Sequence, residues 1–408
     1  MFERLTGTER RWVVGGVVAA LLAVVGFAGP WGPRMIDLEV YRAGADALRH
    51  GTDLYAASEP STGLVFTYPV FAAMLFVPFS LLPDSLARGA LTLLSLGALF
   101  VVVYLTVRHV RRARSTAGPR GTTLTWSIGL SVGAIAVHPV WETLTFGQVN
   151  VILAAMVMVD LLTTRTGRWR GVLVGIAAGI KLVPGIFIVY LLVTGQRRSA
   201  LYAALSTLAT VLIGFAVQPG PQWAFWTRYV RDPDRTGGIA YVTNQSFLGV
   251  SARLLRDPHP PGALSLALGV FVLVVALLLA ARLTRAGDAF TAVTVVAVAS
   301  LLASPVSWSH HWVWVVPCLG TLVVWARTGR PGAWRWWVLG VVAAIVASGP
   351  MQFTPKEQLR ELHDTLPQQF VANIYALLAL VFLGWLAVRT LRTADRSVTV
   401  SPASAPTA

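Results

Sequence analysis

Long apolar stretches recur along the whole chain and are separated by short polar segments. A hydrocarbon core about 30 Å thick is crossed by roughly 20 apolar residues in helical conformation. The pattern therefore predicts an all-α polytopic membrane protein. The stretches with few or no charges are residues 12–29, 86–107, 124–140, 149–162, 201–217, 264–281, 290–303, 312–325, 337–347 and 370–388.

Two further stretches are apolar but interrupted. Residues 66–82 contain Pro69 and Pro78, and residues 172–193 contain Lys181 and Pro184. Proline inside a helix removes a backbone hydrogen bond and breaks or kinks the helix. Broken helices at membrane depth are tolerated where protein or a cavity surrounds them. We predict that residues 66–82 are re-entrant or interfacial, and that residues 172–193 form a hairpin of two half-helices.

The positive charge lies in short segments beside the ends of the apolar stretches. The formal net charge is +15, from 33 Lys and Arg against 18 Asp and Glu. Short Arg-rich loops face the cytoplasm in most membrane proteins, and this placement explains the charge without a nucleic-acid surface. The segments are residues 4–11, 108–120, 165–170, 197–198, 282–285, 327–335 and 389–396.

These loops fix a predicted topology. Both termini are expected in the cytoplasm, with about ten full spans, or up to twelve if the interrupted stretches cross completely. Residues 30–85 and 218–262 then form long external loops. We expect residues 1–396 to form one membrane domain, and residues 397–408 to form a disordered cytoplasmic tail.

Asp37 stands just beyond the first apolar stretch and begins a helical pattern that ends near Gly51. Aspartate is among the best residues for capping a helix N-terminus. A carboxylate at such a position can instead act as a general base that removes a proton from a hydroxyl group. The local sequence leaves both interpretations open.

Other polar residues at span ends are candidates for binding. Lys181 is the only Lys in an apolar stretch, and ionisable residues at that depth usually face a cavity or a partner. The adjacent pair His310 and His311 is a poor bidentate metal site, because neighbouring side chains on a helix diverge by about 100°. The pair could bind a phosphate or sugar oxygen, or anchor the chain at the interface.

Three further segments contain polar groups. Residues 138–150 are expected to form a short external turn in which Glu142, Gln148 and Asn150 bind sugar hydroxyls or satisfy the turn itself. Asp232 and Asp234 are flanked by arginines, so an ion-paired loop is a better interpretation than a metal site. The single cysteine, Cys318, excludes an intramolecular disulfide and a thiolate metal site.

Seven short motifs follow one another along the chain, at residues 37–41, 51–55, 66–71, 146–150, 180–184, 244–247 and 304–311. Taken in order, they resemble glycosyltransferase family 87. No single motif is specific, but the ordered set covers roughly residues 35–320. One departure is Val70, where the family often has a second proline.

The resemblance implies a GT-C glycosyltransferase fold with about 10–12 transmembrane or re-entrant helices. Members transfer mannose from polyprenyl-phosphate-mannose to lipids and lipoglycans on the external side of the membrane. It implies an α-1,2-mannosyltransferase of the phosphatidylinositol mannoside type, with inversion at the sugar. The active site would face the periplasm, and the acceptor would be a glycolipid in contact with membrane lipids.

The resemblance also assigns roles. Asp37 would be the catalytic base, and Lys181, His310 and His311 would bind the donor phosphate or sugar. No metal or cofactor is expected, and we expect a monomer. The possible substrate-binding residues are Tyr68, Glu142, Gln148, Asn150, Asn244 and Gln245.

Two other functions remain open from the residues alone. The same fold could transfer arabinose from polyprenyl-phosphate-arabinose, since nothing in the sequence identifies the donor sugar. A lipid or sugar transporter is the non-enzymatic alternative. Transporters are commonly built from internal repeats, and we find no convincing repeat in this chain.

Overall fold

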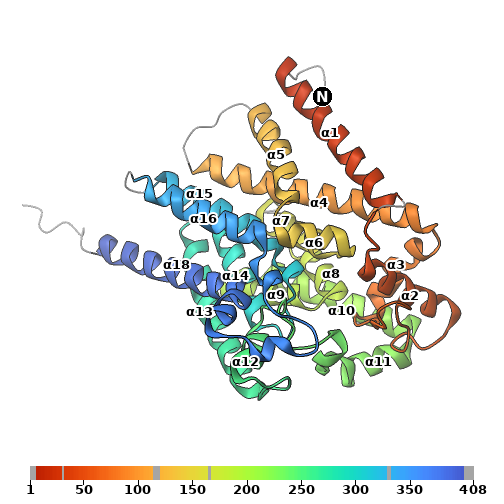
Figure 1. Ribbon diagram of the computed structural model, residues 1–408. Helices are drawn as coiled ribbons and strands as arrows, with labels where there is room; N and C mark the ends of the chain where they lie inside the picture. The colour runs from red at the N-terminus through yellow and green to blue at the C-terminus, as the bar shows by residue number, and fades with distance from the viewer. Residues whose placement is uncertain (1–5, 30–31, 114–119, 164–166, 329–331, 399–408) are drawn as a thin grey trace, which may run out of the picture.

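The computed structural model describes residues 6–29, 32–113, 120–163, 167–328 and 332–398, which are largely helical (Figure 1). The α-helices are α1 (Gly7–Ala28), α2 (Ile36–His50), α3 (Val70–Ser80), α4 (Asp84–Arg112), α5 (Arg120–Ile135), α6 (His138–Phe146), α7 (Asn150–Thr163), α8 (Val172–Ile180), α9 (Ile186–Val193), α10 (Arg197–Val217), α11 (Pro219–Thr227), α12 (Phe247–Leu255), α13 (Gly262–Arg285), α14 (Ala289–Ala303), α15 (Val315–Thr328), α16 (Trp334–Ser348), α17 (Leu366–Ala372) and α18 (Ile374–Val398). Short 3-10 helices are η2 (Val183–Gly185), η3 (Tyr229–Arg231), η4 (Pro233–Thr236), η5 (Ser309–Trp314), η6 (Pro350–Phe353) and η7 (Arg360–His363). Strand pairing in the described residues is limited to two isolated bridges, Ser58 with Val65 and Asn244 with Trp308.

Several helices are suited to crossing a membrane. Among the described residues, five are long and apolar enough to do so, namely α1, α4, α10, α13 and α18. The bent pair of α5 and α6 would make a sixth span. Shorter apolar helices, including α7, α14 and α16, lie among them, and nearly every residue of α14 is buried. The prediction of an all-α, multi-pass membrane protein is confirmed.

The interrupted stretch at residues 66–82 does not form a full span. Its helix, α3, has 11 residues and contains Pro78. At 1.5 Å per residue this helix is about 16 Å long, roughly half of the hydrocarbon thickness. The prediction that this segment does not cross the bilayer agrees with the helix length.

The stretch at residues 172–193 folds back on itself. Helix α8 packs closely against α10 and runs parallel to it. Gly171, just before α8, lies against Ser199 near the start of α10, and Gly179, near the end of α8, lies against Thr210 further along α10. Helix α9 ends three residues before α10 begins, so its end returns to the side on which α8 started. The predicted hairpin is confirmed, with Lys181 and η2 at its tip.

The expectation of a turn over residues 138–150 was wrong. Residues 138–146 form α6, which is bent by 74° from the preceding helix. Pro139 lies in the first turn of α6, where its missing N–H costs nothing and its fixed φ favours a helix start. The helix ends at Gly147, which has a left-handed φ of 71°.

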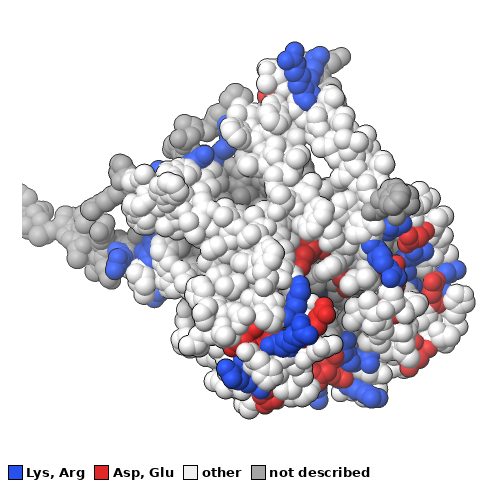
Figure 2. Space-filling model, viewed as in Figure 1, with Lys and Arg blue, Asp and Glu red and all other residues white. Residues whose placement is uncertain are grey.

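Charged side chains are distributed unevenly over the surface. In the view of Figure 2, acidic and basic side chains gather at the lower right, near α2 and α11, and a broad uncharged surface lies above them. At the opposite end, arginines follow the ends of membrane helices, as at Arg111 on α4 and Arg285 on α13. Arg4, Arg114, Arg165 and Arg330 lie outside the described residues. Helix α18 continues to Val398, and the rest of the expected tail also lies outside them.

Candidate active site

A large cavity of about 1120 Å³ opens where the loops that follow α1 and α10 meet the ends of apolar helices. Its wall is formed by the first turn of α2, the segment before α3, the α8–η2 hairpin tip, the loop around η3 and η4, and η5. The cavity therefore collects side chains from segments that are far apart in the sequence. Its polar lining includes Asp37, Tyr68, Gln148, Lys181, His310 and His311.

Asp37 occupies the second position of α2 and does not cap it. The capping position is held by Met35 in a left-handed conformation, with no side-chain hydrogen bond to the helix. The cap interpretation is therefore excluded, and the carboxylate lines the cavity. Burial raises the pKa of Asp37 to about 6, while a hydrogen bond from Gln148 and the charge of Lys181 act to lower it. A carboxylate with this pKa is a stronger base than an ordinary aspartate and is still ionised near neutral pH.

Lys181 extends from the tip of the α8–η2 hairpin. Its Nζ donates to Asn150 Oδ1 over 2.9 Å and lies 3.0 Å from His311 Nε2. An ammonium group has only donors, so Nε2 of His311 must accept, and this imidazole is neutral with its proton on Nδ1. Lys181 Nζ also lies 5.5 Å from the centre of the Tyr68 ring. The cation is thus held by three neighbours at the cavity wall.

Gln148 contacts both Asp37 and Tyr41 of α2. Its Oε1 accepts a hydrogen bond from Tyr41 over 2.8 Å, and the hydroxyl of Tyr41 lies 3.2 Å from that of Tyr68. An ionised carboxylate only accepts hydrogen bonds, so the amide Nε2 of Gln148 is the group that donates to Asp37. Tyr41 was not among the predicted site residues. Its position four residues after Asp37, on the same face of a helix, is the signal that could have identified it.

Gly147 allows the turn between α6 and α7 to approach the start of α2 closely. A Cβ at position 147 would lie 2.8 Å from the Cβ of Leu38, and the residue has a positive φ. Any other residue would be strained and would push the α6–α7 turn away from the start of α2. The glycine in front of Gln148 therefore sets the distance between Gln148 and Asp37.

Glu142 and Asn150 hold η5 in place instead of opening into the cavity. The backbone oxygen of His310 accepts bonds from Thr143 Oγ1 at 2.8 Å and from Asn150 Nδ2 at 3.0 Å. The hydroxyl of Ser309 donates to Glu142, whose other oxygen accepts from Gln352. The structure therefore places these two predicted residues behind the histidines, with Thr143 as a partner that the sequence did not reveal.

Asn244 and Gln245 are fully buried and do not line the cavity. Asn244 Oδ1 accepts from the backbone of Ser307, and Gln245 donates to the oxygens of Val242 and Ala372. Their amide groups fix the loop around η5 and are occupied by the protein itself. A sugar-binding role for these two residues is not supported by this position.

The arginines near Asp232 and Asp234 do not form the expected ion pairs. Arg235 lies 4.2 Å from the centre of the Tyr229 ring and donates to Tyr55 O. In the described part of the chain, the pair found for Asp234 is with His259, at 3.9 Å. Stacking on the tyrosine has taken the place of ion pairing. Within the same residues, no group of three or more His, Cys, Asp and Glu could hold a metal ion.

The sequence model of glycosyltransferase family 87 matches residues 66–305, which is more than half of the chain. The chain belongs to glycosyltransferase family 87. The GT-C class expected for this family is an all-α polytopic membrane fold, in agreement with the helices described above. Lys181 lies within the matched residues of this family 87 protein, whereas Asp37, His310 and His311 lie outside them.

Relatives extend the match over nearly the whole family 87 chain. It is 31% identical over 414 residues to a polyprenol-phosphate-mannose-dependent alpha-(1-2)-phosphatidylinositol mannoside mannosyltransferase of Mycobacterium tuberculosis (strain ATCC 25618 / H37Rv), covering 97% of this chain and 95% of the relative. It is 34% identical over 370 residues to a polyprenol-phosphate-mannose-dependent alpha-(1-2)-phosphatidylinositol pentamannoside mannosyltransferase of Mycolicibacterium smegmatis (strain ATCC 700084 / mc(2)155), covering 88% and 86%. Among solved structures, ArnT from Cupriavidus metallidurans bound to undecaprenyl phosphate is similar with a TM-score of 0.41 and 17% identity, covering 93% of this chain and 77% of that chain.

Proposed function

We propose that this chain transfers mannose from polyprenyl-phosphate-mannose to a hydroxyl group of a phosphatidylinositol mannoside, forming an α-1,2 linkage. Membership of a glycosyltransferase family supports the reaction class. The donor and the acceptor are those in the names of relatives that cover 97% and 91% of the chain.

The observation that carries the proposal is the presence of Asp37 and Lys181 in one cavity. The reaction needs a group that takes a proton from the acceptor and a group that balances charge on the leaving phosphate. A carboxylate with a raised pKa supplies the first. A lysine held by Asn150 and His311 supplies the second as a compact positive charge.

The proposed step is a single displacement. The acceptor hydroxyl oxygen attacks the anomeric carbon of mannose while Asp37 takes its proton. The bond between that carbon and the phosphate oxygen breaks, and the electron pair leaves with polyprenyl phosphate. Lys181 balances the negative charge that develops on this group, and the configuration at the anomeric carbon inverts. No metal or cofactor takes part.

The remaining cavity residues are proposed to bind the sugars. Gln148, Tyr68 and His310 present polar groups or ring edges next to Asp37 and Lys181. The cavity also reaches the start of α13 at Gly262 and Leu266, and Leu266 is 67% exposed. The polyprenyl chain of the donor would leave the cavity at this point and enter the bilayer.

We further propose an orientation and an oligomeric state. The Arg-rich ends of the membrane helices and both termini would face the cytoplasm, in accord with the distribution typical of membrane proteins. Asp37 and the cavity would then face the periplasm. A monomer suffices, because one chain supplies the whole cavity lining.

Arabinose transfer is the enzymatic alternative, and lipid or sugar transport is the non-enzymatic one. A transporter has no need for a base beside a phosphate-binding cation, so the pairing of Asp37 with Lys181 favours an enzyme. The choice between sugars depends on the relatives' donor, since the cavity residues could bind hydroxyl groups of either.

Purified protein in proteoliposomes tests this function directly. It is incubated with a phosphatidylinositol mannoside and either polyprenyl-phosphate-mannose or polyprenyl-phosphate-arabinose, and the lipids are analysed by mass spectrometry. Addition of one hexose, removable by an α-1,2-mannosidase, is expected with the first donor alone. A pentose product, or an unchanged acceptor with both donors, would reject the proposal.

A further inference from the structure

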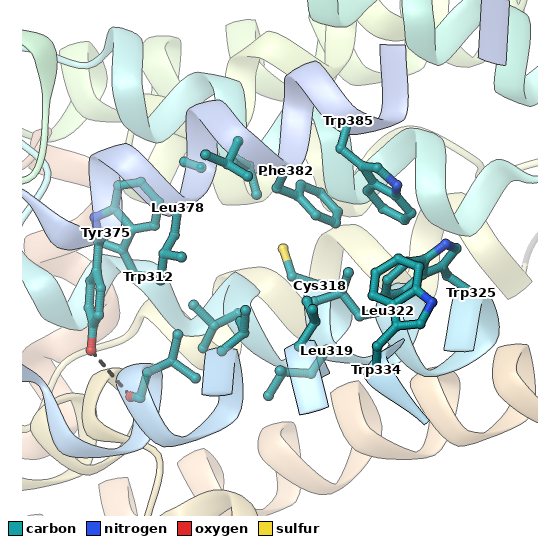
Figure 3. Close-up of a pocket in the computed structure, with 17 residues that line it drawn as sticks. Trp312, Cys318, Leu319, Leu322, Trp325, Trp334, Tyr375, Leu378, Phe382 and Trp385 are labelled. Atoms are coloured by element: carbon teal, nitrogen blue, oxygen red, sulfur yellow. Dashed lines mark hydrogen bonds between the residues drawn. The ribbon is translucent and has the colours of Figure 1, made fainter. Parts of the chain in front are cut away.

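A second cavity of about 300 Å³ lies between α14, α15, α16 and α18, and it is lined almost entirely by apolar side chains (Figure 3). Phe382 and Leu322 lie along its middle, and the sulfur of Cys318 points between them (Figure 3). This groove shares no lining residue with the proposed active-site cavity. It therefore needs an explanation of its own.

The two ends of the groove differ. At one end, the indole rings of Trp325, Trp334 and Trp385 gather, and at the other lie Trp312 and Tyr375 (Figure 3). Trp312 and Tyr375 have ring centres 5.9 Å apart. The hydroxyl of Tyr375 donates to Val346 O over 3.2 Å. This end is closed by rings whose polar atom is already bonded, so it does not suit a charged headgroup.

The tryptophan end carries positive charge. The guanidinium carbon of Arg335 lies 5.1 Å from the centre of the Trp325 ring and 5.6 Å from that of Trp334. The guanidinium carbon of Arg389 lies 5.7 Å from the centre of the Trp385 ring. The two positive charges are close enough to repel each other, and the carboxylate of Asp288 attracts Arg389. The same carboxylate also caps α14 through Thr291 N.

One N–H group of Arg335, beside the tryptophan end of the groove, has no hydrogen-bond partner. Its Nη1 donates to Trp325 O over 3.3 Å, but its Nε is buried and has no hydrogen-bond partner. A phosphate oxygen would satisfy this N–H and reduce the repulsion between Arg335 and Arg389. Tryptophan rings and arginines together are typical of the level of lipid headgroups.

We propose that this groove binds one acyl chain of an anionic phospholipid, with its phosphate between Arg335 and Arg389. The occupant is a lipid of the leaflet on which these arginines lie. Only the exclusion of the donor as the occupant rests on the proposed transfer reaction. The donor's polyprenyl chain is a poorer occupant, because its phosphate would be held at Lys181 in the other cavity and the groove is closed by Trp312 on that side.

Native mass spectrometry of the full chain from mixed vesicles tests this. With phosphatidylglycerol and phosphatidylcholine present, wild type is expected to retain one phosphatidylglycerol. The pair Arg335→Gln and Arg389→Gln is expected to lower the apparent affinity for phosphatidylglycerol roughly tenfold or more. The control pair Arg282→Gln and Arg285→Gln removes the same charge at the end of α13 and is expected to leave retention unchanged.

A second variant keeps the test valid if the arginine pair folds poorly. Cys318→Trp fills the middle of the groove without changing charge, and it is expected to displace the same lipid. Equal retention of phosphatidylglycerol in wild type and both groove variants would overturn the proposal. Displacement of phosphatidylglycerol from wild type by an equimolar amount of polyprenyl phosphate would overturn it as well, since the groove would then belong to the donor.

Discussion

The ammonium group of Lys181 lies 3.0 Å from Nε2 of His311, although 130 positions separate the two residues in the chain. This contact joins the hairpin tip after α8 to η5 and leaves His311 neutral. It fixes the ammonium group of Lys181 at the wall of the cavity that also contains Asp37. The proposed reaction depends on the positive charge of Lys181 and the negative charge of Asp37.

Replacing Lys181 by Met is expected to weaken binding of polyprenyl phosphate. Loss of a charge-assisted hydrogen bond costs about 1.5–3 kcal/mol, which corresponds to roughly a 10–100-fold change in the dissociation constant. The affinity is measured with polyprenyl phosphate alone, which lacks the sugar. Lys356→Met is the matched control, because Lys356 is the only other lysine and bonds to Gln352. Equal affinities in both variants would remove Lys181 from the donor site.

The pH dependence of transfer is expected to report Asp37. The base acts in its ionised form, so kcat/KM should fall as the pH drops below about 6, the pKa to which burial raises this carboxyl. Gln148→Leu removes a hydrogen bond that lowers this pKa, so the midpoint of the acid limb should move to higher pH. A wild-type midpoint near 4, typical of an exposed aspartate, would contradict this assignment.

Transfer is expected to survive chelation of divalent ions. Asp232 and Asp234 lie near arginines that stack on Tyr229, and the histidines contact Lys181 or a phenylalanine ring. The rate is measured with and without EDTA. If activity is lost in EDTA and restored by manganese or magnesium, Asp232 and Asp234 must be reconsidered as ligands.

The proposed orientation predicts which positions react from outside the cell. Single cysteines are introduced at Ser58, His259 and Ala286, all exposed, in a Cys318→Ala background. An impermeant maleimide should label intact cells at positions 58 and 259 and spare position 286. Ala286 lies beside the Arg-rich end of α13. Labelling at 286 without labelling at 58 would invert the topology and place the cavity in the cytoplasm.

The sequence was sufficient for the membrane fold because its signals are local. The length of an apolar stretch predicts a span, and Pro184, three residues after Lys181, predicts the break in the hairpin. The prediction of a turn at residues 138–150 was wrong. In the sequence, an apolar helix followed by a second helix that begins with proline has the same pattern as a span followed by a loop. Only the 74° bend separates the two elements.

The site was only partly predictable, since a polar residue near a span end can face a cavity or another chain segment. Asp37, Lys181, His310 and His311 do line one cavity. Asn244 and Gln245 also lie in one of the family motifs, but their side-chain amides bond to backbone groups of distant segments. Such pairing depends on tertiary contacts, which the sequence pattern does not specify. Tyr41 was missed for the same reason, as its partner Gln148 lies 107 positions away.

The most direct test of the account is the initial rate of mannose transfer by Asp37→Asn beside Glu39→Gln in the same proteoliposomes. Glu39 is an acid on the same helix that lies 3.7 Å from Arg34 and does not line the cavity. Asp37→Asn should lose about 10²–10⁴-fold of the rate, with a thermal stability no lower than wild type because a buried charge is removed. Glu39→Gln should stay close to wild type. Retention of more than about a tenth of the rate by Asp37→Asn, well outside that range, would show that Asp37 is not the base.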